Sequence, residues 1–205
     1  ISINPQTMSD QVLRAIGRRH TARDIREAFC TAREVGFACI NMDLIAGLPQ
    51  DSVEGFRDSL EEVLALRPEN ITVHTLAMKK GSRLMEEGGA LPSGEETGRM
   101  VDLSLEALEG AGYRPYYLYR QKYMSGGLEN VSWCLPGTEN HYNIIMMEEL
   151  QSVLSLGAGG VTKLVDRSSG RIVRLTNPKY PHDYLAMSAK VLEQKDEILR
   201  FYREV

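Results

Sequence analysis

The chain has 205 residues, of which 42% are hydrophobic and 25% charged, and its formal net charge is -4. These values are typical of a globular protein and exclude a disordered tail, while the acidic balance argues against duplex nucleic acid as the main partner. No apolar run approaches the roughly 18 residues of a membrane span, and the first residues lack a signal-peptide pattern, so we expect a cytoplasmic protein. The 3 cysteines lack CxxC-type spacing, which fits a reducing compartment and makes a poor metal site.

Helices and strands alternate over the first part of the chain. Apolar residues recur at helical spacing over residues 21–36 and again over residues 53–66. Strands are predicted over residues 37–46 and 71–77, directly after these helices. Short units of this kind imply a parallel sheet with right-handed crossovers. Such a sheet binds its ligands at the carboxyl ends of its strands.

The alternation stops after residue 81. The pattern then predicts a helix over residues 95–109, an aromatic strand over 113–123, a loop over 126–137, a helix over about 143–156, a hairpin with strands 163–166 and 171–176, and a last helix over about 182–202. We therefore place a boundary near residues 80–112, with one domain over residues 1–90 and a second over residues 91–205.

Asp43 is the most informative residue of the first domain. It lies in the apolar strand that ends at the Gly47-Leu48-Pro49 turn. A buried Asp without a partner is strongly unfavourable, so its side chain either caps local backbone or faces a ligand, and we favour the ligand. Gln6 and Ala77 also lie at predicted strand ends.

Several segments resemble one enzyme family. Gln6, the triplet Gly17-Arg18-Arg19 and the strand DLIAGLP occur in the order and spacing of the radical S-adenosylmethionine enzymes of the oxygen-independent coproporphyrinogen III oxidase (dehydrogenase) type. Further segments are similar to the C-terminal part of that family: residues 117–124, 128–130, 136–139, 147–149 and 156–159. The resemblance extends from Ser2 to about Lys163.

The resemblance implies a fold and a set of cofactors. The expected fold is α/β, the back half of an incomplete (β/α)6 TIM-like barrel followed by an α+β C-terminal domain. The cofactors are S-adenosylmethionine and a [4Fe-4S] cluster held by three closely spaced cysteines, a motif that this chain lacks. The chain also opens on Ile1-Ser2-Ile3 without a methionine. We therefore expect a piece of a longer enzyme, inactive by itself, whose cluster is bound by cysteines outside these residues.

The resemblance also assigns cofactor-binding residues. Gln6 resembles a strand-end amide that contacts S-adenosylmethionine, and Arg18 resembles the arginine beside its sulfonium or carboxylate. Asp43 resembles the acid that binds the ribose, and Ala77 a position whose backbone meets the adenine. These roles suit the side chains, because a guanidinium binds a carboxylate in two places and an ionised Asp accepts bonds from a diol. No residue of this chain is assigned a catalytic or metal-binding role.

The implied reaction belongs to haem biosynthesis. The parent enzyme would remove a hydrogen atom from a propionate of coproporphyrinogen III, and decarboxylation would leave a vinyl group; the electron acceptor is not identified. One alternative is a haem-binding chaperone of the same superfamily, with His20, His74, His141 or His182 as axial ligands. Another is an inert fragment without the cluster, with an exposed sheet edge at residues 2–4.

Simpler roles compete with several of these assignments. Arg18 by itself is typical of a solvated surface charge. His74 is at least as readily explained as a hydrogen-bonded structural histidine. For five tyrosines, packing is favoured over stacking on a tetrapyrrole: Tyr113, Tyr116, Tyr117, Tyr119 and Tyr123. For three cations, a solvated surface position competes with binding of a propionate: Lys79, Lys80 and Arg120.

Overall fold

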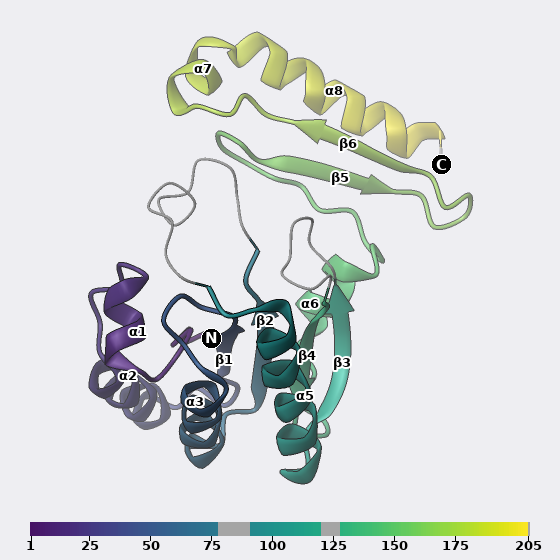
Figure 1. The fold of residues 1–205 in the computed structure, drawn as a ribbon. Coiled ribbons are helices and arrows are strands. Elements are labelled where there is room, and N and C mark those ends of the chain that lie inside the picture. The colour runs from purple at the N-terminus through teal and green to yellow at the C-terminus, as the bar shows by residue number, and fades with distance from the viewer. Residues whose placement is uncertain (78–90, 120–127, 205) are drawn as a thin grey trace. The chain divides into compact units, whose positions relative to one another are not determined.

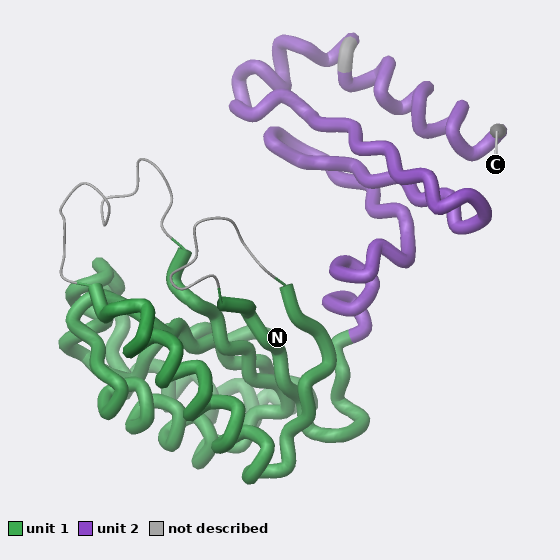
Figure 2. Tube along the Cα trace, turned by 45° about the vertical axis from the view of Figure 1, so that its right-hand side comes forward, with its two compact units in different colours: residues 1–140 green, residues 141–205 purple. Residues whose placement is uncertain are grey.

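The computed structural model describes residues 1–77, 91–119 and 128–204. The chain divides into two compact units, Ile1–Asn140 and His141–Val205 (Figures 1 and 2). In the described part of the chain no helix is long and apolar enough to cross a membrane.

The first unit is built on one sheet. Its strands are β1 (Asn41–Ala46), β2 (Asn70–Thr75), β3 (Arg114–Tyr119) and β4 (Asn130–Cys134), in the order β1-β2-β4-β3. β1 and β2 are parallel, whereas β4 is antiparallel to both of its neighbours. The first residues of the chain extend the sheet at β1 through parallel bridges of Ser2 with Asn41 and of Gln6 with Leu44. Three adjacent parallel segments are the arrangement expected for the back half of the barrel.

In the described part of the chain, the helices beside this sheet are α1 (Asp10–Ala15), α2 (Ala22–Val35), α3 (Val53–Leu66) and α5 (Gly94–Gly110). α2 begins with a capping box between Thr21 and Asp24 and ends at Gly36, whose φ of 98° is left-handed. The side chain of Ser52 caps α3 in the same way. These local signals explain why the helices predicted over residues 21–36, 53–66 and 95–109 are confirmed.

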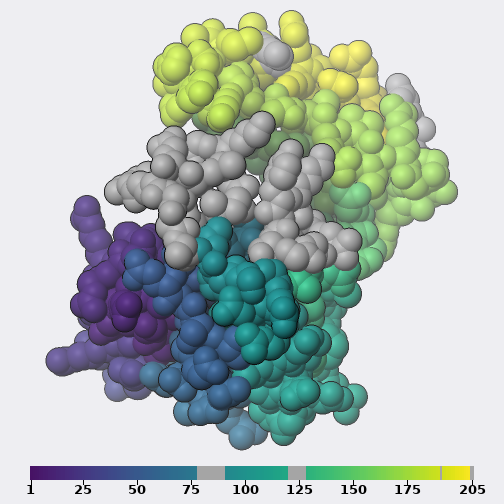
Figure 3. Space-filling view, viewed as in Figure 1, coloured from purple at the N-terminus to yellow at the C-terminus, as the bar shows by residue number. Residues whose placement is uncertain are grey.

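The helices cover one face of the sheet. Alternate strand residues such as Met42, Leu44 and Val73 are buried against α2, α3 and α5, and they form one apolar core with Phe29, Phe56, Leu60 and Met100. In the space-filling view the blue and teal atoms of α3 and α5 adjoin each other on this side (Figure 3). Because strand side chains alternate, the remaining strand positions point to the opposite face, which is polar.

The second unit contains a hairpin and three helices. The hairpin strands are β5 (Val161–Val165) and β6 (Ile172–Thr176), and the helices are α6 (His141–Met147), α7 (Pro181–Ala186) and α8 (Ser188–Glu204). Leu164, Leu175 and Phe201 form its small core. The predicted hairpin is therefore confirmed, and the predicted last helix consists of two helices separated at Met187.

Two sequence-based predictions are wrong. The loop predicted over residues 126–137 contains β4, because β2 and β3 supply hydrogen-bond partners on both of its sides. The helix predicted over residues 143–156 ends at Met147. The following chain becomes extended because Val153 exchanges two backbone hydrogen bonds with Lys163, at 2.7 and 2.8 Å.

The compact units divide the chain between Asn140 and His141, well beyond residue 90. The reason is that β3 and β4 join the sheet of β2 and that α5 packs in the same core as α3. The division into domains 1–90 and 91–205 describes where the barrel-like part ends, and it stays a prediction.

Candidate functional site

The polar face of the first unit's sheet, which lies opposite the helices, carries a run of functional side chains on neighbouring strands. β1 contributes Asn41 and Asp43, and β2 contributes Thr72, which pairs with Asp43, and His74, which pairs with Ile45. The antiparallel strands add Asn130, Ser132, Tyr117 and Tyr119. These residues recur with the period of two that places side chains on one face of a sheet.

Asp43 lies within this face with its side chain 18% exposed. Its Oδ1 accepts a hydrogen bond from the Asn41 amide nitrogen at 2.7 Å. Its Oδ2 lies 3.5 Å from Nε2 of His74. The carboxylate is therefore held by one group on each oxygen, and a carboxylate oxygen can accept a further bond. In the described part of the chain the Asp43 carboxylate contacts side chains and not local backbone, and its role toward a ligand stays a prediction.

His74 joins Asp43 to Tyr119. Its Nδ1 lies 3.0 Å from the Tyr119 hydroxyl, and the two rings meet edge to face. Burial raises the pKa of Tyr119, and the neighbouring Tyr117 adds to this rise, while a hydrogen bond with Asn130 opposes it. The Tyr119 hydroxyl therefore keeps its proton at neutral pH. The prediction of a hydrogen-bonded His74 is confirmed, and its partners lie on the polar face.

Gln6 occupies an irregular position beside Asp43. Its backbone N–H donates to the Asp43 carbonyl at 2.9 Å, and its side-chain amide donates to the Asn4 carbonyl at 3.2 Å. Four residue steps separate Ser2 from Gln6, whereas the bridged residues Asn41 and Leu44 are three apart, so the first strand bulges. Gln6 has a φ of 68°, a left-handed conformation that non-glycine residues seldom adopt except where the surroundings impose it.

Ala77 and Arg18 complete the predicted set. Ala77 follows β2, and the preceding Leu76 N–H donates to the carbonyl of Ala46 at 3.0 Å, so Ala77 lies beyond the carboxyl end of both strands. Arg18 follows α1 and is exposed. Its backbone N–H donates to Leu13, and its guanidinium has no hydrogen bond or ion pair within the described ranges. The structure thus places Gln6 and Asp43 side by side, whereas it shows no contact between Arg18 and Asp43.

The sequence predictions missed several polar residues of the polar face. Asn130 and Ser132 were overlooked because their strand was predicted as a loop, and Asn41 was not distinguished from its apolar neighbours. The signal that reveals them is the alternation of polar and apolar residues in INMDLI and NVSW. Among the tyrosines, packing is confirmed for Tyr113, which is buried and donates to the Pro68 carbonyl at 2.6 Å. Lys79, Lys80, Arg120 and Tyr123 lie outside the described residues.

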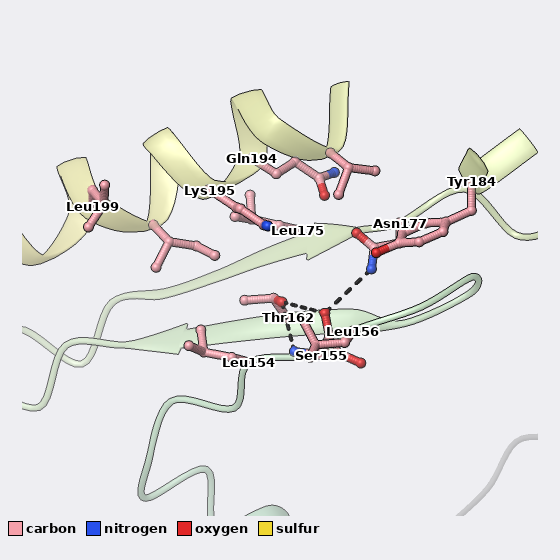
Figure 4. A pocket seen from close by; sticks show the side chains of 12 residues that line it. Leu154, Ser155, Leu156, Thr162, Leu175, Asn177, Tyr184, Gln194, Lys195 and Leu199 are labelled. Atoms are coloured by element: carbon pink, nitrogen blue, oxygen red, sulfur yellow. Dashed lines mark hydrogen bonds between the residues drawn. The ribbon is translucent and has the colours of Figure 1, made fainter. Parts of the chain in front are cut away.

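The second unit contains a cavity of about 310 Å³ between its hairpin and its last helices (Figure 4). Its walls are mainly apolar, with Leu154, Leu175 and Leu199 among them. Its polar groups bond to one another, since Thr162 accepts from the Ser155 N–H at 3.0 Å and Asn177 donates to the Ser155 carbonyl at 3.4 Å. No group of acids, histidines or cysteines suited to a metal occurs in the described residues of either unit.

Comparison with known proteins places this site in a family context. No family model matches the chain. Over 207 residues it is 41% identical to the oxygen-independent coproporphyrinogen-III oxidase-like protein HemZ of Bacillus subtilis, covering 100% of this chain and 41% of HemZ. It is also 30% identical over 134 residues to the heme chaperone HemW of Bacillus subtilis, covering 63% of this chain and 35% of HemW.

The fold resembles that of coproporphyrinogen III oxidase (HemN) from Escherichia coli, a radical SAM enzyme. The TM-score is 0.65 at 20% identity, and the match covers 87% of this chain and 40% of that one. The chain therefore has the α/β fold of the radical SAM class, as predicted. Within that class, its similarity to HemZ confirms the resemblance to the oxygen-independent coproporphyrinogen III oxidase-like family. The chain spans less than half the length of these relatives.

Proposed function

We propose that the protein is a radical SAM oxidoreductase of haem biosynthesis, located in the cytoplasm, that converts propionate side chains of coproporphyrinogen III to vinyl groups. On this proposal the 205 residues supply part of the S-adenosylmethionine site, and the ligands of the [4Fe-4S] cluster lie in sequence other than these residues. The proposal draws on the similarity to HemZ and on the polar face around Asp43.

The observation that carries the proposal is the position of Asp43. Its carboxylate lies on the polar face, partly exposed, with Asn41 on one oxygen and His74 near the other. Each oxygen retains a lone pair that can accept a hydroxyl of the ribose diol. An acid held in this way is prepared for a ligand, because its orientation is already set before binding.

The neighbouring residues also fit S-adenosylmethionine. Gln6 has a left-handed backbone conformation beside Asp43, and strained backbone of this kind is often found at binding sites. The exposed Arg18 guanidinium can pair with the carboxylate of the methionine part, which suits its fork of donors. Backbone groups at Ala77, beyond the carboxyl end of β2, can meet the adenine. We assign Gln6, Arg18, Asp43 and Ala77 to binding and orientation of the cofactor, and none of them to proton transfer.

Bound S-adenosylmethionine with the reduced cluster would supply the hydrogen-abstracting chemistry, and the propionate would lose one hydrogen atom, CO2 and one electron, which an acceptor would take up. On this proposal the residues described above would hold and orient the ribose. Tyr117 and Tyr119 offer aromatic rings on the same face, where a tetrapyrrole can pack.

The test uses the full-length gene product, prepared anaerobically with its cluster and supplied with a reductant. Formation of 5'-deoxyadenosine, CO2 and a vinyl porphyrinogen from coproporphyrinogen III is measured together. We expect the double variant Arg18→Ala, Asp43→Ala to lose turnover while it remains folded. The control is Arg19→Ala, Asp58→Ala, which removes the same charges from exposed positions. Normal turnover in the first double variant would contradict the proposal.

Haem carriage is the second candidate, because the chain is also similar to a protein named heme chaperone HemW. The surroundings of His74 disfavour it as an axial ligand, since its two ring nitrogens face Tyr119 and Asp43. A Soret band that appears on addition of haem and disappears when His20, His141 or His182 is replaced would support carriage. Consumption of coproporphyrinogen with release of CO2 would support catalysis instead.

A further inference from the structure

We propose that His74 is a positioning residue for the cofactor: it orients the Asp43 carboxylate toward the ribose diol of S-adenosylmethionine, and Tyr119 and Asn130 fix the orientation of its ring. This inference rests on the proposed function, because it takes Asp43 as the ribose-binding acid. Its basis is a series of polar contacts across four strands, β2, β4, β3 and β1, whose donors and acceptors can be assigned one after another.

The series begins at a backbone group, whose direction is certain. The Thr75 N–H donates to Oδ1 of Asn130 at 2.7 Å, and the bond is buried. A backbone N–H can only donate, so the Asn130 side chain must present its oxygen to Thr75 and its NH2 group elsewhere. Asn130 pairs with Tyr119 in the register of β4 and β3, and its NH2 group is the donor that opposes the rise in the pKa of Tyr119.

The direction then passes through the tyrosine to the histidine. Since the Tyr119 oxygen accepts from Asn130, its hydroxyl hydrogen is available for Nδ1 of His74 at 3.0 Å. With Nδ1 accepting, the ring hydrogen of His74 lies on Nε2. Nε2 faces Oδ2 of Asp43 at 3.5 Å, so the ring presents a donor to the carboxylate. Shortening of this contact is expected once a ligand shields the site from water.

A second series fixes the other oxygen of Asp43. The Thr72 hydroxyl donates to Oδ1 of Asn41 at 3.2 Å, which leaves the Asn41 NH2 group to donate to Asp43 at 2.7 Å. Asp43 is thus oriented from both sides by side chains whose own orientations are set by neighbours. Such a carboxylate loses little freedom when a diol binds to it, which is why positioning partners raise affinity without touching the ligand.

A purely structural histidine would need none of this directionality. The side chains of His74 and Asp43 are both partly exposed, at 24% and 18%, so the pair is accessible to a ligand rather than enclosed in the core.

Two fragments of the cofactor test whether His74 acts on the ribose. 5'-Methylthioadenosine carries the ribose and adenine, whereas methionine carries neither, so a ribose-directed role predicts an effect on the first probe alone.

The experiment compares two amide replacements of His74 in the full-length gene product with its cluster. The amide nitrogen of Gln occupies nearly the place of Nε2, whereas the side-chain oxygen of Asn can occupy nearly the place of Nδ1 and accept from the Tyr119 hydroxyl. His74→Gln therefore keeps a donor for Asp43, whereas His74→Asn keeps only a partner for Tyr119. Equilibrium dialysis gives the dissociation constants for S-adenosylmethionine and the two probes, and thermal unfolding is recorded for each variant.

We expect His74→Asn to weaken 5'-methylthioadenosine and S-adenosylmethionine by roughly tenfold, and His74→Gln by no more than about threefold. Methionine binding stays unchanged in both. Tyr119→Phe removes the donor to Nδ1 and weakens 5'-methylthioadenosine severalfold. Tyr202→Phe, which changes an exposed tyrosine of α8 outside this series, leaves the affinity unchanged.

The outcomes separate this inference from the proposed function. Failure of the unmodified protein to bind S-adenosylmethionine overturns the proposed function. If it binds and Asp43→Ala weakens the complex, but His74→Asn binds as tightly as the unmodified protein, only the inference is overturned. Equal losses in His74→Asn and His74→Gln that extend to methionine and accompany a lower melting temperature also overturn it, because they show a structural role.

Discussion

Thr72 and Asn41 lie on adjacent parallel strands, and the hydroxyl of Thr72 donates to the amide oxygen of Asn41 at 3.2 Å. The same hydroxyl lies 2.7 Å from that of Ser132 on the opposite neighbour, β4. One buried threonine thus connects the strand that carries Asp43 with the antiparallel part of the sheet. Asn41 in turn donates to Asp43, so the Thr72 hydroxyl supports the orientation of the amide that holds the carboxylate.

Replacement of Thr72 by Val keeps the shape of the side chain and removes the hydroxyl. Because Ser132 is fully buried, its hydroxyl loses its closest partner, and the amide of Asn41 loses a donor. We expect the free energy of unfolding to fall by about 1–3 kcal/mol, measured by urea denaturation. The control is Thr31→Val on the exposed side of α2, which should change stability far less. Equal effects at the two positions would show that the bonds around Thr72 contribute little.

Asp51 and Asp24 predict opposite pH dependences of stability. Burial raises the pKa of Asp51, with only the Ser52 N–H opposing, and its Oδ2 has no partner among the described residues. Bonds from the backbone and hydroxyl of Thr21 lower the pKa of Asp24. On acidification the folded protein protonates Asp51 before the unfolded chain does, which stabilises it. Asp24 contributes stability above its unfolded pKa of about 3.9 that is lost as the pH falls below this value.

Urea unfolding of two Asn variants at pH ~7 and pH ~3 tests these signs. The stability of Asp51→Asn relative to the unmodified protein should decrease on going to the acidic condition. That of Asp24→Asn should increase, because its deficit is present at neutral pH and disappears in acid. Comparison of each variant with itself at two pH values cancels the pH-independent effect of the amide. Parallel trends in the two variants would contradict the assignment.

Gly47 and Gly36 separate backbone strain from steric contact. Both have left-handed φ angles, 84° and 98°, so Ala is strained at either position. A Cβ at Gly47 would lie 3.0 Å from the Thr97 hydroxyl oxygen, whereas one at Gly36 meets nothing within 4 Å. We expect Gly36→Ala to cost about 1 kcal/mol and Gly47→Ala an additional ~1–3 kcal/mol, measured by chemical denaturation. Equal costs would show that α5 moves away freely.

Arg33 and Glu69 form an ion pair that connects α2 with the start of β2. One guanidinium nitrogen lies 2.8 Å from each carboxylate oxygen, and Glu69 also accepts the Ile40 N–H at 2.9 Å. A double-mutant cycle with Arg33→Met and Glu69→Gln should give a coupling of about 1 kcal/mol, because the pair is only partly exposed. The exposed pair Arg23 and Glu27 is the matched control and should couple less. A larger coupling there would refute the burial argument.

The helices of the first unit were predictable because their signals are local. The Thr21 and Asp24 capping box, the Ser52 cap and the left-handed Gly36 each depend on residues within one turn. β4 was not predictable in the same way. Its extended conformation is stabilised by partners from β2 and β3, which are distant in the sequence, so the surrounding Gly and Pro residues dominated the local pattern.

The sequence by itself indicated the family and the parallel strand and helix units, and it singled out Asp43 as a candidate, because periodicity, caps and motif spacing are written along the chain. It also brought Gln6, Arg18 and Ala77 forward as cofactor-binding candidates through the resemblance. The tertiary structure decided which groups face Asp43. His74 lies beside Asp43, and Tyr119 and Asn130 follow it in the series of polar contacts. These residues come from three strands whose order in the sheet, β2-β4-β3, differs from their order along the chain. Only pairing and register bring such residues to one face, since these depend on contacts between distant segments.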